Sequence, residues 1–267
     1  AVRNLVLGSG SIYGRRMVGG IVGRTGSIPT GIYLENCANH ASVKNTDSKG
    51  VGGIVGAGWS KGAIVNCYNT GSVTTGYACP AGGICGSNSG LDIYNCYNVG
   101  TIDSSGSQRG RAIGGHNNGS YTVSDCYYLE GCDDDPASNG YYKGTSRKIS
   151  VSVTAADQKT LQSDTVIAAL NANGAVFAQD TAGKNGGYPV LWFETQPRTE
   201  VCKITQTAAA NGTFTVSRTG EAAFGTSVSL TAQPDAGYRL AYFTANGAPI
   251  LGGYYTLTGD TALAAVF

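Results

Sequence analysis

Short apolar segments recur through the first half of the chain, separated by glycine and small polar residues. One block sets a Gly-Gly pair in an apolar frame, with copies at residues 18–23, 51–56 and 81–86 and a weaker copy at 113–116. A second block ends in Asn-Cys, or in Asp-Cys in its last copy, and its cysteines stand 30, 29 and 30 residues apart: Cys37, Cys67, Cys96 and Cys126. A third apolar block begins six residues after each of these cysteines. The repeats cover residues 1–135.

Each repeat holds three apolar stretches of strand length and shows no helical period. Strands that pair with their equivalents in the next repeat build a parallel β-solenoid, in which successive coils lie about 4.8 Å apart. We expect right-handed coiling because parallel crossovers strongly prefer that hand. The glycines are expected at the corners, where a positive φ or a close backbone approach excludes a side chain. The fold class is therefore mainly β.

The residue before each repeated cysteine decides which way the cysteine points. Strict alternation from the apolar residue three positions earlier, such as Ile64, would put Asn66 inside and Cys67 outside. A bend at the asparagine would reverse this order and bury the cysteine. We favour the bend, because free cysteine is among the most buried residue types and asparagine readily adopts turn conformations.

Eight cysteines would ordinarily suggest four disulfides in an exported protein. Four of them share one repeat position, however, and two others replace valine at core positions. Stacked parallel side chains point in the wrong direction for a disulfide. We therefore predict six reduced, structural core cysteines: Cys37, Cys67, Cys85, Cys96, Cys126 and Cys132. Cys79 and Cys202 fall outside the pattern.

Two further segments follow the repeats. Residues 168–192 resemble the segment that commonly closes such repeat arrays, which implies that residues 136–195 cap the solenoid; a short helix is expected there, which Ser163 or Asp164 begins and Gly174 ends. Residues 200–267 alternate apolar and polar positions, which predicts a small β-rich domain. Its hairpin signals are Asn211-Gly212 and Asn246-Gly247.

The blocks resemble two known families. Residues 51–56 and 66–73 read VGGIVG and NCYNTGSV, and they resemble the GLUG motif of bacterial surface proteins and of the non-catalytic region of some IgA1-specific metallopeptidases. Residues 200–267, which contain the phrase AQPDAGY, resemble a divergent internalin B-type repeat. These resemblances imply an extracellular protein, at the bacterial cell surface or secreted. The last repeat departs from the motif, with His116 at an isoleucine position, which suggests a capping coil.

The composition argues against several other classes of protein. The chain has 41 glycines in 267 residues, 13% charged residues and a net charge of +1. So much glycine excludes helical bundles, the apolar content disfavours disorder, and the balanced charge disfavours a nucleic-acid partner. No apolar run is long enough to span a membrane. The chain opens at Ala1 without an initiator methionine or a signal peptide, so we expect a fragment of a longer protein.

Three sets of residues are candidates for binding. Tyr68, Tyr97 and Tyr127 share one repeat position and form an aromatic ladder. If the ladder faces outward, it can stack on sugar rings or protein side chains of a host glycan or matrix protein; if it faces inward, it is core. Residues Asp133, Asp134 and Asp135 are expected to form a solvated turn, with a structural calcium site as the alternative and no other cofactor. A small basic patch, formed by Arg15, Arg16 and Arg24, is expected to be a solvated loop.

The expected function is non-enzymatic: an extracellular stalk or presentation segment of an adhesin-like bacterial surface protein. The alternative is an accessory, non-catalytic region of a secreted peptidase or of a polysaccharide-active enzyme. A third hypothesis, that the solenoid itself cleaves glycans, requires carboxylates clustered in one groove. His40 and His116 are expected to be structural.

Overall fold

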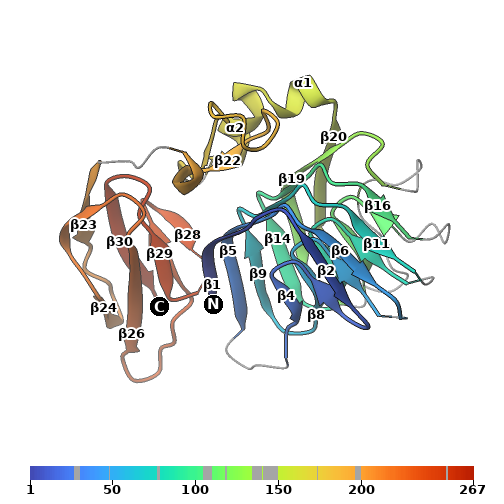
Figure 1. Cartoon of the computed structure of the whole chain (residues 1–267). Coiled ribbons are helices and arrows are strands. Elements are labelled where there is room, and N and C mark those ends of the chain that lie inside the picture. Colours follow the sequence, from blue (N-terminus) through green and yellow to red (C-terminus); the bar gives the residue numbers. More distant parts are fainter. Residues whose placement is uncertain are drawn as a thin grey trace. The chain divides into compact units, whose positions relative to one another are not determined.

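The computed structural model describes residues 1–26, 31–47, 49–76, 79–104, 110–117, 119–133, 140, 150–172, 174–195, 200–250 and 252–267. The chain divides into two compact units (Figure 1). The solenoid unit comprises Ala1–Asn171 and Phe177–Leu191, and the C-terminal unit comprises Ala172–Val176 and Trp192–Phe267.

The predicted parallel β-solenoid is confirmed, and four parallel sheets build it (Figure 1). Sheet A contains β1 (Val2–Leu7), β5 (Ile32–Asn39), β9 (Gly62–Val65), β10 (Tyr68–Asn69), β14 (Leu91–Tyr94), β15 (Tyr97–Asn98), β19 (Thr122–Leu129) and β20 (Ser150–Ala156). Sheet B contains β2 (Ser11–Gly14), β6 (Ser42–Asn45), β11 (Val73–Thr75) and β16 (Ile102–Asp103). Sheet C contains β3 (Val18–Gly19), β7 (Val51–Gly52), β12 (Ala81–Gly82) and β17 (Gly110–Arg111). Sheet D contains β4 (Val22–Arg24), β8 (Val55–Gly58), β13 (Cys85–Asn88) and β18 (Gly114–Asn117).

The middle coils contain five short strands each, where the sequence pattern predicts three. In the coil from β7 to β11, the Gly-Gly block divides into β7 and β8 on either side of Gly53 and Ile54. The Asn-Cys block divides into β9 and β10 at Asn66, whose φ is +53°. Both blocks bend, so each contributes two strands rather than one.

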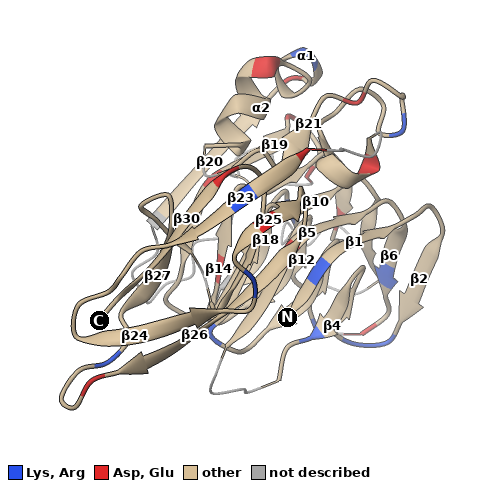
Figure 2. Cartoon of the chain, turned by 90° about the vertical axis from the view of Figure 1, so that its left-hand side faces the viewer, with Lys and Arg blue, Asp and Glu red and all other residues tan. Residues whose placement is uncertain are grey.

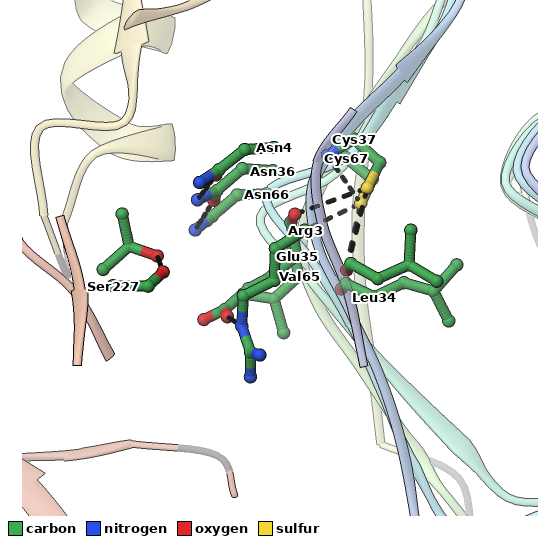
Figure 3. Close-up of polar contacts among 12 residues, drawn as sticks. Arg3, Asn4, Leu34, Glu35, Asn36, Cys37, Val65, Asn66, Cys67 and Ser227 are labelled. Carbon is green, nitrogen blue, oxygen red and sulfur yellow. Dashed lines mark hydrogen bonds and ion pairs between the residues drawn. The ribbon is translucent and has the colours of Figure 1, made fainter. Parts of the chain in front are cut away.

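The predicted bend at the asparagine is present in every coil. Its φ lies between +50° and +56° at Asn36, Asn66, Asn95 and Asp125. Asn and Asp adopt this left-handed conformation more readily than other residues with a side chain. Figure 3 shows the result: Asn4, Asn36 and Asn66 point to one side of the strands, whereas Cys37 and Cys67 point to the other. The outer amides form a ladder, in which Asn36 Nδ2 donates to Asn4 Oδ1 at 2.9 Å and Asn66 Nδ2 to Asn36 Oδ1 at 3.1 Å.

A second asparagine ladder lies inside the solenoid. Asn39, Asn69 and Asn98 are fully buried. Asn39 Nδ2 donates to Asn69 Oδ1, and Asn69 Nδ2 donates to Asn98 Oδ1, both at 2.7 Å. Each side chain also donates to a backbone carbonyl two residues ahead in its own coil. These bonds satisfy amides that would otherwise be costly to bury.

The Gly-Gly pairs stand at the bends between sheets C and D, where they lie against this inner ladder. A Cβ on Gly53 would stand 2.2 Å from Gly83 O and 2.3 Å from Asn69 Cγ, so only glycine fits. Sheets C and D also approach closely, since a Cβ on Gly86 would stand 2.3 Å from Val51 O. Neither Gly53 nor Gly86 is among the glycines with positive φ. Close approach, the second of the two predicted reasons, therefore explains these glycines.

The backbone contact between sheets C and D divides the interior into two apolar clusters. The larger one joins sheets A and D and includes Leu34, Ile54, Ile64, Ile93 and the repeated cysteines. The smaller one joins sheets B and C and consists of Val18, Val43, Val51, Val73, Ala81 and Ile102, with Ile12 packed against it. Every coil contributes to at least one cluster, so the stack buries two continuous columns of apolar side chains.

The last coil differs from the sequence-based alignment. Gly114 pairs with Cys85 and His116 with Ser87, so Gly114 and Gly115 do not correspond to the earlier Gly-Gly pairs, and His116 does not stand at an isoleucine position. Arg111 occupies the place of the first glycine, because it pairs with Gly82. The inner asparagine is also absent from this coil, since Tyr128 pairs with Asn98. Ala112 follows at the place of the second glycine, which contacts an asparagine side chain in the earlier coils, so this glycine is lost together with the inner asparagine.

A cap follows the last coil and belongs to the solenoid unit. It contains α1 (Gln158–Leu161), α2 (Asp164–Leu170), β21 (Phe177–Ala178) and β22 (Val190–Leu191). Ser163 is the N-cap of α2, as one of the two predictions has it, and its hydroxyl accepts from Val166 N. The helix ends at Leu170, earlier than the predicted Gly174. Asn171 pins the following strand, since its side chain bonds both Phe177 N and Phe177 O.

The C-terminal unit is built of β-sheets, as its alternating sequence predicts, and its strand pairs are antiparallel except for β23 with β30, which is parallel. One sheet has the order β25-β23-β30-β27-β28 and the other β24-β26-β29. The bounds are β23 (Val201–Gln206), β24 (Gly212–Val216), β25 (Gly220–Ala223), β26 (Ser227–Pro234), β27 (Tyr242–Ala245), β28 (Ala248–Ile250), β29 (Tyr254–Thr256) and β30 (Thr261–Val266). A 3-10 helix, η1 (Trp192–Glu194), precedes them. Asn246-Gly247 connects the hairpin β27–β28 as predicted, but Asn211-Gly212 does not join a hairpin, because β24 pairs with β26 rather than with β23.

Replacing Gly53 with alanine tests the contact between the glycine and the asparagine ladder. We expect Gly53→Ala to lower the free energy of unfolding by at least about 3 kcal/mol, because the new methyl group overlaps backbone and a buried amide. Gly8→Ala is the matched control, since a Cβ there meets nothing within 4 Å. Urea denaturation of both variants measures the difference, and equal stabilities would contradict the proposed contact.

Candidate functional site

The predicted tyrosine ladder lies along sheet A, one residue after the inward-pointing cysteines. Tyr68 pairs with Tyr97, and Tyr97 pairs with Tyr127. Because Cys67 and Cys96 belong to the larger apolar cluster, alternation turns the tyrosines outward. The rings of Tyr68 and Tyr97 stack with centroids 4.9 Å apart and planes 6° apart.

The cap covers the Tyr97 ring of the stacked pair. Tyr97 contacts Phe177 with ring centroids 5.9 Å apart. Its hydroxyl donates to Pro189 O and accepts from Asn185 Nδ2 at 2.8 Å. Tyr68 is 0% and Tyr97 1% exposed, so neither ring leaves a surface open to a ligand. Tyr97 forms part of the surface on which the cap docks.

The cap reaches Tyr97 through a loop that a carboxylate organises. Asp180 accepts from Lys184 N at 2.8 Å, Asn185 N at 2.7 Å and Gly187 N at 3.0 Å. Burial alone would raise the pKa of Asp180, but these backbone hydrogen bonds lower it. The loop therefore holds Asn185 in position beneath the Tyr97 hydroxyl.

The remaining members of the ladder have different surroundings. Tyr127 is half-buried, and burial, with the nearby Asp125 charge, raises its pKa. At the other end, Tyr68 OH lies 3.2 Å from His40 Nε2, and His40 Nδ1 lies 2.8 Å from Thr70 Oγ1. His40 thus has the structural surroundings that the sequence suggests.

The six predicted core cysteines all lie buried and without disulfides, as do Cys79 and Cys202. In the repeated position, each thiol lies near the carbonyl of the residue two positions earlier, for example Cys67 Sγ to Val65 O at 3.2 Å and Cys96 Sγ to Tyr94 O at 3.1 Å. Each of these carbonyls directly precedes the bend, so the thiol supplies a weak donor close to a break in the sheet. The sulfur also accepts, since Cys37 N donates to Cys67 Sγ at 3.4 Å.

Two other cysteines complete polar networks. Asn98 Nδ2 donates to Cys132 Sγ at 3.4 Å, so Cys132 ends the inner asparagine ladder. Cys79 Sγ lies 3.0 Å from Thr75 Oγ1 and 3.2 Å from Lys49 O. Asparagine recurs two residues after Cys37, Cys67 and Cys96. This recurrence is the sequence signal for the inner ladder, which the sequence-based predictions do not include.

Burial suppresses the acidity of these thiols. It raises the pKa of Cys85 to about 12, and burial together with the Asp133 charge does the same for Cys132. The pKa values of Cys67 and Cys96 lie well above the ordinary value, chiefly through burial. The thiolate is the reactive form of cysteine, so these side chains are chemically inert in the folded chain.

The aspartate triplet is described only at its first member. Asp133 Oδ2 accepts from Ala112 N at 3.1 Å, so this carboxylate holds the last coil together. Asp134 and Asp135 lie outside the described residues. No group of three or more potential metal ligands occurs in the described part of the chain.

The predicted basic patch is an ordered cluster on the first coil. Arg15 and Arg16 both bond Asp47 Oδ2 through Nε, at 3.2 Å and 2.7 Å. The Arg24 guanidinium lies over the Trp59 ring, 4.9 Å from its centroid. All three arginines are exposed, as the sequence suggests, although Arg24 stands on β4 rather than in a loop, and each also has a specific neighbour.

Chemical reactivity tests the thiol assignments. We expect all eight thiols of the purified chain to resist a disulfide reagent at about pH 8, because all eight are buried away from the reagent. All eight should react once the chain is denatured without reductant. Rapid reaction in the folded state would contradict their burial, and fewer than eight thiols after denaturation would indicate disulfides.

The docking of the cap can be tested at Tyr97. Tyr97→Phe removes the hydroxyl that bonds both Pro189 and Asn185, and we expect it to lower the free energy of unfolding by about 1–2 kcal/mol. Tyr13→Phe is the matched control, because Tyr13 is 70% exposed. Limited proteolysis should then cut the 180–187 loop faster in Tyr97→Phe only. Equal cutting of the two variants would show that the hydroxyl does not hold the cap.

Comparisons with known proteins agree with this architecture. Curated proteins gave no match. A solved structure from Bacteroides ovatus, described as a "putative immunoglobulin A1 protease", matches with a TM-score of 0.51 and 24% identity over 72% of this chain and 57% of that chain. At this identity the likeness shows the fold alone, and this chain spans less than two thirds of that protein's length.

Two family models match in sequence order. The GLUG motif matches residues 47–74, and the divergent InlB B-repeat domain matches residues 202–267. Both are repeat types typical of extracellular surface proteins, and no helix in the described part of the chain is long and apolar enough to cross a membrane. The chain therefore carries a GLUG motif followed by a divergent InlB B-repeat domain, as its two resemblances predicted.

Proposed function

We propose that this chain is a non-enzymatic, extracellular stalk or presentation segment of an adhesin-like bacterial surface protein. The observation that carries the proposal is the inner asparagine ladder, which links successive coils by side-chain bonds of 2.7 Å. Together with the backbone contact at Gly53, it fixes each coil on the next. A stack held in this way resists bending and keeps its outer residues free to vary.

The known contacts of the solenoid carboxylates support a scaffold. Glu35 pairs with Arg3, and burial raises the pKa of Glu35 although the hydrogen bond and charge of Arg3 act to lower it. Asp47 pairs with two arginines. Asp92 accepts from Thr122 N at 2.6 Å. Each of these groups has a structural partner, which favours a scaffold over glycan cleavage by clustered carboxylates.

The family matches support an extracellular location, on a bacterial surface or secreted. Such a segment would meet host glycans or matrix proteins. A second candidate is an accessory, non-catalytic region of a secreted peptidase or polysaccharide-active enzyme. The Bacteroides ovatus structure favours it, because that protein is described as a protease and shares the solenoid fold.

One experiment separates these candidates. The purified chain is incubated with immunoglobulin A1, a mixed peptide library and a panel of polysaccharides, and both cleavage and binding are measured. The stalk predicts no cleavage and no retention of immunoglobulin A1. Retention without cleavage would favour the accessory region, whereas cleavage that co-purifies with the chain and disappears in Gly53→Ala would overturn the non-enzymatic proposal.

A further inference from the structure

Exposed aromatic and basic side chains occur on the N-terminal coils of the solenoid, on β2, on β4 and directly after β8. Among the described residues of the solenoid unit, three large apolar side chains are more than a third exposed: Leu5, Tyr13 and Trp59, at 44%, 70% and 42%. Trp59 is in contact with Arg24, and Tyr13 stands two residues before Arg15. Figure 2 shows the basic segments beside β4 and β6. We name this set the Arg-Trp cluster: Tyr13, Arg15, Arg16, Arg24, Asp47 and Trp59.

The arginines of this cluster stand on two neighbouring backbone segments of the first coil, β4 and the β2–β3 connection. A Cβ on Gly23 would stand 2.8 Å from Met17 O, so the end of β4 lies against the start of β3. Arg24 follows Gly23, and Arg16 precedes Met17. The backbone at Arg24 therefore lies close to the backbone at Arg16 in the first coil.

The cluster has more positive charge than its carboxylate neutralises. Arg15 and Arg16 share the single carboxylate of Asp47, and each bonds it through Nε only. Their side chains are 80% and 54% exposed, whereas Asp47 is 19% exposed. Asp47 therefore orients the two arginines from below, and the terminal nitrogens of both can bond an anion in the bidentate manner of guanidinium groups.

Trp59 adds an ordered aromatic surface. Its backbone N–H donates to Thr25 Oγ1 at 2.8 Å, and Thr25 is buried, so the turn that carries the indole is fixed. Arg24 lies over part of the ring, and 42% of the residue stays exposed. Apolar faces of sugar rings pack on aromatic rings in this position, since the ring offers a flat apolar surface.

We propose that the Arg-Trp cluster binds an acidic polysaccharide. Sulfate or carboxylate groups of the ligand bond Arg15 and Arg16, and a sugar ring packs on Trp59. The balanced net charge of +1 makes a nucleic acid the less suitable polyanion, because such partners require a broad basic surface. The proposal goes beyond the stalk function, because a stalk without this ligand would keep its fold and its role.

Binding assays with defined polymers test the site. Heparin supplies sulfate groups, polygalacturonate supplies carboxylates, dextran is the neutral polymer and single-stranded DNA is the phosphate polymer. We expect the intact chain to bind heparin or polygalacturonate at about 0.15 M salt, where weak surface attraction is largely screened. Arg15→Ala/Arg16→Ala should weaken that binding at least about tenfold, since it removes two charge-assisted contacts.

Arg218→Ala/Arg239→Ala is the matched control, because it removes the same charge from the C-terminal unit. It should leave the affinity unchanged. Ligand addition should alter tryptophan emission in the wild type but not in Trp59→Phe. Equal weakening by both arginine pairs, tighter binding of DNA than of either acidic polysaccharide, or no binding by the folded wild type would each overturn the proposal. Thermal unfolding of every variant confirms that the fold is retained.

Discussion

The solenoid depends on a contact between a glycine that lacks a side chain and a buried asparagine amide. Gly53 lies so close to Asn69 and to the carbonyl of Gly83 that a single methyl group would not fit. This approach lets the chain turn back inside the coil and brings sheets C and D into backbone contact. The two apolar clusters on either side follow from that contact. The glycine pairs and the inner asparagines of the repeat are therefore the two partners of one contact.

The bend at Asn66 explains why cysteine recurs beside it. A left-handed residue turns the next side chain inward and interrupts the regular sheet close to a carbonyl. The residue that follows must be small, apolar enough for the core and able to donate weakly to that carbonyl. Serine would bury a strongly polar hydroxyl, and valine would leave the carbonyl without this contact. Cysteine meets all three requirements.

Periodic features were predictable from the sequence, and features without a period were not. The parallel stack, the bend and the inward cysteines each recur every coil, so several copies support each inference. Asn185 of the cap bonds the hydroxyl of Tyr97 from 88 residues away. Asn185 lies in a segment without repeats, so no periodic pattern predicts this contact. The sequence-based alignment of the last coil was wrong because its Gly-Gly pair stands three residues after the aligned position. The inner asparagine that packs against such a pair in the earlier coils is absent from this coil. The Gly-Gly motif predicted the structure where the asparagine that it packs against is present, and it misled where that asparagine is absent.

The inner ladder also has a direction. Every amide donates toward the C-terminal coil, and the last donor, Asn98, meets the thiol of Cys132 instead of another asparagine. A duplication that inserts one whole repeat between two asparagine-bearing coils would renew each bond without changing either end. A copy added after the last coil would find no amide donor for its own asparagine oxygen, because Tyr128 stands at the asparagine position of that coil. Gene duplication can therefore lengthen this solenoid by inserting internal coils, whereas the last coil does not support a further coil at the C-terminal end.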